Sequence, residues 1–273
     1  MQNNIKTSGL TQSIIKILFI GDIVGRPGRK TVAKVLPELK EKEQLDVIIA
    51  NGENSAGGFG IQEKVYEELI SCGIDVITLG NHAWSQKEFV NFISRCDRLI
   101  RPANFPDGSP GKGSLILEKD DFKIGVLNLQ GRVFMEPIDC PFIKGKAEIE
   151  KLKKNTPLII VDFHAEATSE KLALGHFLGD SISALLGTHT HIQTADERLI
   201  QNHTAYITDV GMTGAYDSIL GMKKEMIMQW MIYHLPAKFI VGEGTTIFNG
   251  VILEIDKFSG KSKSIKRLNF LID

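Results

Sequence analysis

The chain has 273 residues, of which 42% are hydrophobic, and a formal net charge of −1 at pH 7. This composition is typical of a globular protein with a substantial core, and the near-zero charge argues against a bulk nucleic-acid surface. No run approaches the roughly 20 apolar residues of a membrane helix, so we expect no membrane segment. The three cysteines are far apart and in no metal-ligand spacing, which favours free thiols and a cytoplasmic location.

The apolar pattern of the first two thirds predicts an α/β fold. Short runs rich in Ile, Val and Leu, each ended by a polar or glycine-containing turn, predict buried strands. These runs are Lys16–Ile20, Asp46–Ala50, Asp75–Leu79, Ser114–Glu118, Lys123–Leu129, Leu158–Phe163 and Ile182–Leu186. Between the first three runs, apolar residues at helical spacing predict two crossover helices, around Val32–Leu39 and Val65–Ile70.

The pattern changes after about Gly187, where further strands joined by loops are predicted without clear helices. The predicted strands are Thr204–Val210, Met226–His234, Thr246–Ile255 and Ser264–Ile272. We therefore expect a second, more antiparallel sheet packed on the first. Because no linker, repeat or change in composition divides the chain, we expect one domain over residues 1–273, with residues 1–14 as a disordered or frayed extension.

Side chains that can bind metals follow five of the predicted strands. In chain order they are Asp22, Glu53 with Asn54, Asn81, His164, and His189 with His191. Ligands of α/β sheets bind beyond the carboxyl ends of the strands, so we expect these side chains to meet at one sheet edge. Each has an ordinary structural explanation when taken alone, and the coincidence of all five is what favours a functional site.

The residue types indicate the chemistry of the predicted site. Imidazoles and carboxylates without a thiolate suit zinc, manganese or iron. Seven ligands exceed what one four-coordinate ion requires, so two ions that share a bridging carboxylate fit the number, and such a pair could clamp a phosphoryl group. The remaining histidines, His176, His203 and His234, lack comparable neighbours and are interpreted as structural or surface residues.

These blocks resemble the calcineurin-like metallophosphoesterase superfamily, through Gly80-Asn81-His82 and Gly187-Thr188-His189-Thr190-His191. Two departures, Asp22-Ile23-Val24 without a histidine and Glu53 in place of an aspartate, resemble the bacterial YmdB-like branch. The blocks of that branch are present at Gly21–Gly25, Asn51–Asn54, Gly80–Trp84 and Asp209–Ser218. The similarity extends from about Lys16 to the C-terminus.

The resemblance implies a four-layer α/β/β/α sandwich and a metal-dependent phosphoric diester hydrolase that acts on 2′,3′-cyclic nucleotides. It implies that one ion is held by Asp22, Asn54 and His191. A second ion would be held by Asn81, His164 and His189, and Glu53 would bridge the two ions. His82 would donate a proton to the leaving oxygen as a metal-bridging hydroxide attacks. The ions would be divalent or of mixed valence, iron or manganese, with zinc as the alternative.

Other functions stay open on the sequence alone. One is a broad phosphomonoesterase or a diesterase of phospholipid head groups, and another is a regulatory protein that uses the metal site for binding. A nicotinamide-dependent dehydrogenase is disfavoured, since Gly21, Gly25 and Gly28 do not form its glycine fingerprint. The expected partner is a small cyclic nucleotide, and a homo-oligomer stays open.

Overall fold

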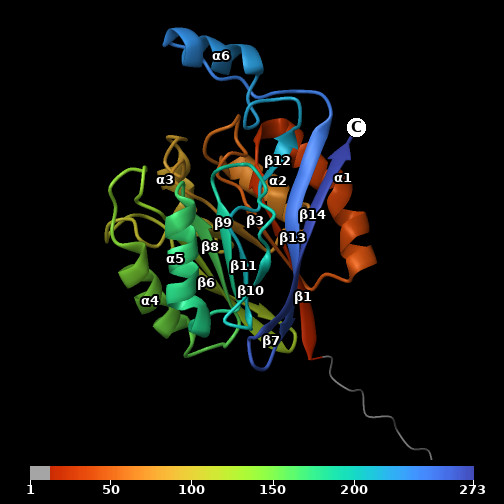
Figure 1. Cartoon of the computed structure of the whole chain (residues 1–273), viewed down its shortest axis with the longest axis vertical. Coiled ribbons are helices and arrows are strands. Elements are labelled where there is room, and N and C mark those ends of the chain that lie inside the picture. The colour runs from red at the N-terminus through yellow and green to blue at the C-terminus, as the bar shows by residue number, and fades with distance from the viewer. Residues whose placement is uncertain (1–12) are drawn as a thin grey trace, which may run out of the picture.

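The computed structural model describes residues 13–273, which form two β-sheets with helices on their outer faces (Figure 1). The first sheet has eight strands, and seven of them lie in the order β2 (Asp22–Ile23), β12 (Met212–Ala215), β13 (Thr246–Asp256), β1 (Ile14–Ile20), β3 (Val47–Asn51), β4 (Val76–Thr78) and β5 (Leu99–Ile100). The eighth strand, β14 (Ser262–Ile272), pairs with β13.

The second sheet has six strands, in the order β10 (Arg198–Ile200), β11 (Thr204–Ile207), β9 (Ala184–Thr188), β8 (Ile159–His164), β7 (Phe122–Gln130) and β6 (Ser114–Lys119). The α-helices are α1 (Gly25–Glu43), α2 (Glu63–Ser71), α3 (Phe89–Phe92), α4 (Pro141–Leu152), α5 (Thr168–Leu178) and α6 (Lys224–Tyr233). Two short 3₁₀ helices, η1 (Ile93–Arg95) and η2 (Gly179–Ser181), complete the described elements.

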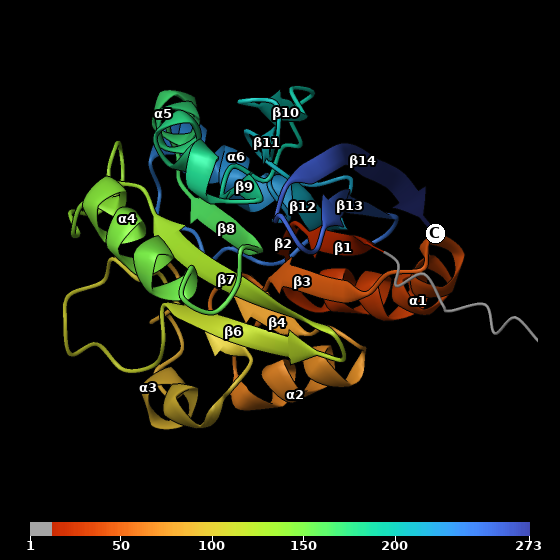
Figure 2. The ribbon, with the colours of Figure 1, turned by 90° about the horizontal axis from the view of Figure 1, so that it is seen from below.

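Three apolar layers hold this arrangement together as a four-layer α/β/β/α sandwich (Figure 2). One layer joins α1, α2 and α3 to the first sheet, a second fills the space between the two sheets, and a third joins α4 and α5 to the second sheet. Strand β1 shows how the sequence builds two of these layers. Ile17 and Phe19 lie between the sheets, whereas Leu18 and Ile20 face the helices, as the period of two requires.

The predicted strands of the first two thirds and both predicted helices are confirmed, but the division into sheets was wrong. The late strands β13 and β14 do not form a second sheet. They extend the first sheet, because β13 pairs antiparallel with the whole length of β1 and β14 pairs with β13. The second sheet is instead built largely from strands β6 to β9. Of these, β7, β8 and β9 run parallel to one another.

The prediction of a strand over Met226–His234 was also wrong, since this segment lies in α6. The helix stands apart from the body in Figure 1, and Ile227 is its one buried residue. A projecting segment finds no neighbouring strand to pair with, so only a helix can satisfy its backbone groups internally. This isolation outweighs whatever local preference for a strand the segment has.

The predicted extension over residues 1–14 falls mainly outside the described residues, and Ile14 already belongs to β1. Within residues 13–273, none of the helices combines the length and apolar character needed to cross a membrane. The expectation of one domain over residues 1–273 stays a prediction.

Candidate active site

All seven candidate ligands lie where strands end, but they come from two sheets rather than from one sheet edge as we expected. Strands β1, β3 and β4 of the first sheet are followed by Asp22, by Glu53 with Asn54, and by Asn81. Strands β8 and β9 of the second sheet carry the histidines, with His164 as the last residue of β8. The two edges meet, because His164 contacts Glu53 and His191 lies beside Asp22.

Four of these residues place ligand atoms around one point. His164 Nε2 lies 2.9 Å from Glu53 Oε1, 3.0 Å from Asn81 Oδ1 and 3.0 Å from His189 Nδ1. One ligand atom each from Glu53, His164 and His189 falls within 4.8 Å of the other two, a spacing that could hold a metal ion. The Glu53 and Asn81 oxygens can only accept, and each ring nitrogen also accepts when the proton of its imidazole lies on the other nitrogen, so a shared cation suits the four atoms better than mutual hydrogen bonds.

The other three residues gather beside this cluster. His191 Nε2 lies 2.9 Å from the Asn54 side-chain amide and 3.8 Å from Asp22 Oδ1. The Asn54 amide also reaches Glu53 Oε1 at 3.4 Å, so Glu53 touches both groups. Asp22 is fully buried, yet its Oδ1 has no hydrogen-bond partner within residues 13–273. An orphaned buried carboxylate oxygen is costly, and a bound cation would satisfy it.

The backbone around the cluster is shaped for close approach. A Cβ on Gly80 would lie 2.1 Å from the His164 ring and 2.4 Å from Glu53 Oε2, so only glycine fits before Asn81. His189 and His191 adopt φ values of +100° and +65°, a region that costs non-glycine residues roughly 1–3 kcal/mol each. Strain of this kind persists only where surrounding contacts enforce it.

Asp209 supplies those contacts for the histidine loop. Its Oδ2 accepts hydrogen bonds from the Thr190 backbone N–H at 3.0 Å and from Lys171 Nζ at 2.7 Å, and its Oδ1 accepts one from the Gly211 backbone. Asp209 and Lys171 are both fully buried. This ion pair fixes Thr190, which lies between the two strained histidines, and thereby the direction of both imidazoles.

A second buried carboxylate orients His164. Thr188 Oγ1 donates to Asp162 Oδ1 at 2.7 Å and accepts from His164 Nδ1 at 2.9 Å. These hydrogen bonds keep a proton on His164 Nδ1, so a cation that displaced the proton on Nε2 would meet a lone pair directed at Glu53 and His189, which is how metal-binding histidines are commonly held. His189, the other histidine of the cluster, has its Nε2 3.1 Å from Glu166 Oε2. If that nitrogen carries the proton, the Nδ1 lone pair of His189 faces His164.

The sequence reasoning missed these supporting residues. Asp162 left a signal, because it interrupts an otherwise apolar strand, and Asp209 lies in the block at Asp209–Ser218. Glu166 and Lys171 left none, since each occupies an ordinary position in or before a helix. Their roles follow only from the packing of α5 against the second sheet.

His82 lies at the rim of the cluster and makes no contact there through its ring nitrogens. Its backbone N–H donates to Glu53 Oε2 at 3.1 Å, and its half-buried ring packs edge-on against Phe59, with 4.9 Å between centroids. Burial lowers the pKa of His82. Ser85 Oγ lies 3.4 Å from Nδ1, which leaves Nε2 available to a ligand.

The metal-free cluster distributes its protons unevenly. Burial would raise the pKa of Glu53, but the neighbouring His164 lowers it to about 2. Burial would lower the pKa of His164, but Glu53 raises it to about 9. Burial, assisted by the charge of His164, lowers the pKa of His189 to about 3. His189 is therefore neutral, and a cation bound among these groups would displace the proton shared by Glu53 and His164.

Two face-to-face sheets under helices, with carboxylates, amides and histidines gathered where their strands end, define a fold of the metallophosphoesterase type. A Staphylococcus aureus protein described as a candidate 5′-nucleotidase shows the same fold, with a TM-score of 0.62 and 17% identity over 96% of this chain and 55% of that one. This type of fold implies divalent metal ions, and the Glu53, His164 and His189 group could bind one.

The chain belongs to the YmdB-like family, whose family model, described as "YmdB-like protein", matches residues 18–268. It is 51% identical to the 2′,3′-cyclic-nucleotide 2′-phosphodiesterase of Bacillus subtilis, over 93% of this chain and 96% of that protein. A crystal structure of a Mycoplasma pneumoniae phosphatase superposes with a TM-score of 0.89 and 36% identity, over 95% of this chain and 94% of the other.

Proposed function

We propose that the protein is a metal-dependent phosphodiesterase that hydrolyses 2′,3′-cyclic nucleotides. The observation that carries this proposal is the 51% identity, along nearly the whole chain, to a Bacillus subtilis protein named for that reaction. The gathered ligand set supports it, because a protein that had lost catalysis would be expected to lose ligands as well. In the proposed reaction water adds to phosphorus, the bond from phosphorus to the ribose 2′ oxygen breaks, and that oxygen takes a proton.

Two ions would be held by this chain's residues. We assign Asp22, Asn54 and His191 to one ion, and Asn81, His164 and His189 to the other, with Glu53 bridging because its Oε1 reaches both groups. The donors suit iron or manganese, with zinc as the alternative. When bound, such ions would activate water and neutralise phosphoryl charge.

His82 would act as the proton donor to the 2′ oxygen. Its backbone is held by the hydrogen bond to Glu53 Oε2 and its ring packs against Phe59, so both contacts keep the imidazole at the rim. A ribose alkoxide is a poor leaving group and needs a proton as the bond breaks. Because Nε2 carries no hydrogen bond within the described residues, it is available for this task.

The test of the proposed activity is a comparison of substrates on one preparation. We expect kcat/KM for a 2′,3′-cyclic nucleotide to exceed that for a linear diester and for a 2′- or 3′-phosphomonoester, and the product to carry its phosphate on the 3′ oxygen. Preference for the monoester or for a phospholipid diester would contradict the proposal. Absence of turnover with a full metal complement would favour a regulatory role.

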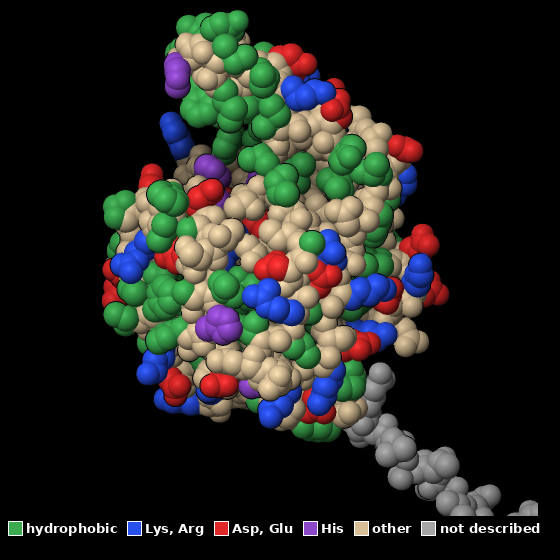
Figure 3. All heavy atoms as spheres, viewed as in Figure 1, with side chains coloured by type: hydrophobic (Ala, Val, Ile, Leu, Met, Phe, Trp, Pro, Cys, Tyr) green, Lys and Arg blue, Asp and Glu red, His purple; other side chains and the backbone are tan. Residues whose placement is uncertain are grey.

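A cytoplasmic location and a homo-oligomer stay predictions. The location is supported by the three cysteines, all of which are free thiols. The oligomer is supported by α6, where Trp230, Met231 and Tyr233 are 45%, 57% and 67% exposed. Figure 3 shows this projecting lobe covered with hydrophobic side chains. An exposed apolar surface of this kind is typical of a protein contact.

A further inference from the structure

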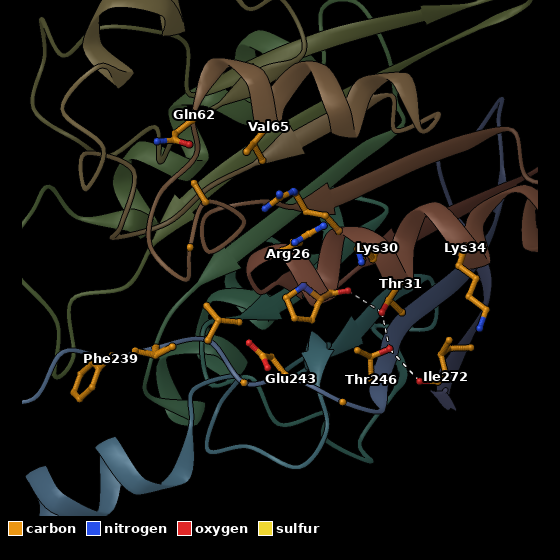
Figure 4. Close-up of a pocket in the computed structure, with 18 of the residues that line it drawn as sticks. Arg26, Lys30, Thr31, Lys34, Gln62, Val65, Phe239, Glu243, Thr246 and Ile272 are labelled. Atoms are coloured by element: carbon orange, nitrogen blue, oxygen red, sulfur yellow. Dashed lines mark hydrogen bonds between the residues drawn. The ribbon is translucent and has the colours of Figure 1, made fainter.

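A second cavity, separate from the histidine cluster, lies beside the first turns of α1. Its volume is about 1000 Å³, at the upper end of the size range of small-molecule sites. Helix α1 and the end of β14 form one side, the start of α2 closes another, and the loop over residues 238–244 faces them (Figure 4). None of the seven candidate metal ligands lines it.

Positive charge is concentrated on the α1 side of this cavity. Arg26, Lys30 and Lys34 are spaced by four residues and therefore share one face of the helix, which borders the cavity. Like charges at this spacing repel, and cations in the first turns also oppose the helix dipole. These repulsions are small for exposed side chains, and an anion bound against this face would relieve them.

Most of these cations lack a carboxylate partner. Within residues 13–273, Arg26, Lys30 and Lys238 form no ion pair, whereas Arg29 is held by Glu68 at 2.9 Å. Lys34 donates only to the Asp273 backbone oxygen, at 2.6 Å. Five cationic and two acidic side chains line the cavity. One of the acidic side chains, Glu243, pairs at 3.9 Å with Lys223, which does not line the cavity.

The rest of the lining suits the nucleoside part of a phosphorylated ligand. Phe239 and Val241 from the loop, with Val65 from α2, provide apolar and aromatic surface. Gln62 provides an amide that can donate and accept hydrogen bonds. Figure 4 shows Phe239 at the opposite end of the cavity from Lys30 and Lys34. One side of its ring packs edge-on against Trp230 of α6, with 6.1 Å between centroids, so a base would stack against the remaining surface while a phosphate lies at the other end.

The cavity shares a wall with the metal-ligand cluster. Gly25 donates its backbone N–H to the Asn54 oxygen at 2.8 Å, and a Cβ on Gly25 would lie 2.8 Å from Val241. Arg29 Nη1 also donates to the Ser55 oxygen, at 2.6 Å. The loop that follows Glu53 is therefore supported from the cavity side.

We propose that this cavity is a second binding site, for a nucleotide-type ligand whose phosphate lies against Arg26, Lys30 and Lys34 and whose base lies against Phe239. The site does not depend on the proposed activity of the metal cluster, because it uses none of its residues.

The test is binding of adenosine 5′-monophosphate to the metal-loaded protein, measured by calorimetry. Lys30→Ala/Lys34→Ala should weaken binding about tenfold or more, because a phosphate loses two charge-assisted contacts. Lys40→Ala/Lys42→Ala removes the same charge from the exposed far end of α1 and should leave binding unchanged. Glu53→Gln should also retain binding, which separates this site from the metal cluster.

Inorganic phosphate serves as the second probe and should bind more weakly than the nucleotide, since it cannot reach Phe239. Hydrolysis of bis-nitrophenyl phosphate by Lys30→Ala/Lys34→Ala should match that of the unsubstituted protein, which shows that the variant is folded. Equal affinity for both probes would contradict a nucleotide site. Absence of nucleotide binding at millimolar concentration, unchanged affinity in Lys30→Ala/Lys34→Ala, or loss of binding only in Glu53→Gln would overturn the proposal altogether.

Discussion

The two sheets contribute different chemistry to the candidate active site. The first sheet supplies the carboxylates and amides of Asp22, Glu53, Asn54 and Asn81, and the second supplies imidazoles only. Neither set alone resembles a binding site for two transition-metal ions. The site forms only when the apolar layer between the sheets docks them in register, so the sandwich is itself a part of the site. Ions bound to both sheets would stabilise the docked state through their binding free energy.

The largest effect is expected where the contributions of the two sheets meet, at Glu53. Glu53→Gln removes the carboxylate charge that contacts His164 and the Asn54 amide, so metal content and turnover should fall together. We expect a loss of turnover on the order of 10⁴-fold, because metal-assisted stabilisation is worth several kcal/mol. Elemental analysis and kinetics on one preparation measure both quantities.

His203→Ala is the matched control for this change. His203 hydrogen-bonds the Gln201 backbone oxygen and lies outside the cluster, so both metals and near-normal turnover should remain. Two retained ions and full activity in Glu53→Gln would show that the sheets do not share a ligand there.

A smaller and more selective effect is expected at His82, which we propose serves the leaving group rather than the ions. His82→Ala should keep the metal content and lose about 10²–10⁴-fold in turnover of 2′,3′-cyclic nucleotides. The loss on a bis-nitrophenyl diester should be markedly smaller, since nitrophenolate leaves without a proton. Equal losses on the two substrates would remove the proton-donor assignment and leave the ligand sets untouched.

The smallest effect is expected at Glu166, which contributes to the second sheet's histidines from outside the cluster. Glu166→Gln weakens the contact that orients His189, and such supporting contacts are worth about 10–100-fold in metal affinity. We expect the low end, about tenfold, because Glu166 is 49% exposed and water can replace it. Titration of the metal-depleted protein measures this. An unchanged affinity would show that the Asp209 contacts alone hold the histidine loop.

The same contrast explains what the sequence could and could not predict. Polar residues at strand ends are local features, so all seven candidate ligands could be predicted from the short runs that precede them, and the structure brings these residues together. The division into sheets is not local, because β13 joins β1 across more than 200 residues of chain. Likewise α6 is a helix because nothing lies beside it, and Lys171 matters only because α5 brings it to Asp209.

The most direct test of the account is the number of metal ions bound per chain, counted by elemental analysis in the unsubstituted protein and in His191→Ala. The account predicts two ions in the unsubstituted protein and preferential loss of one in the variant, because His191 lies with Asp22 and Asn54 while Asn81, His164 and His189 remain. One ion in the unsubstituted protein, or equal loss of both in His191→Ala, would contradict a two-ion site divided in this way.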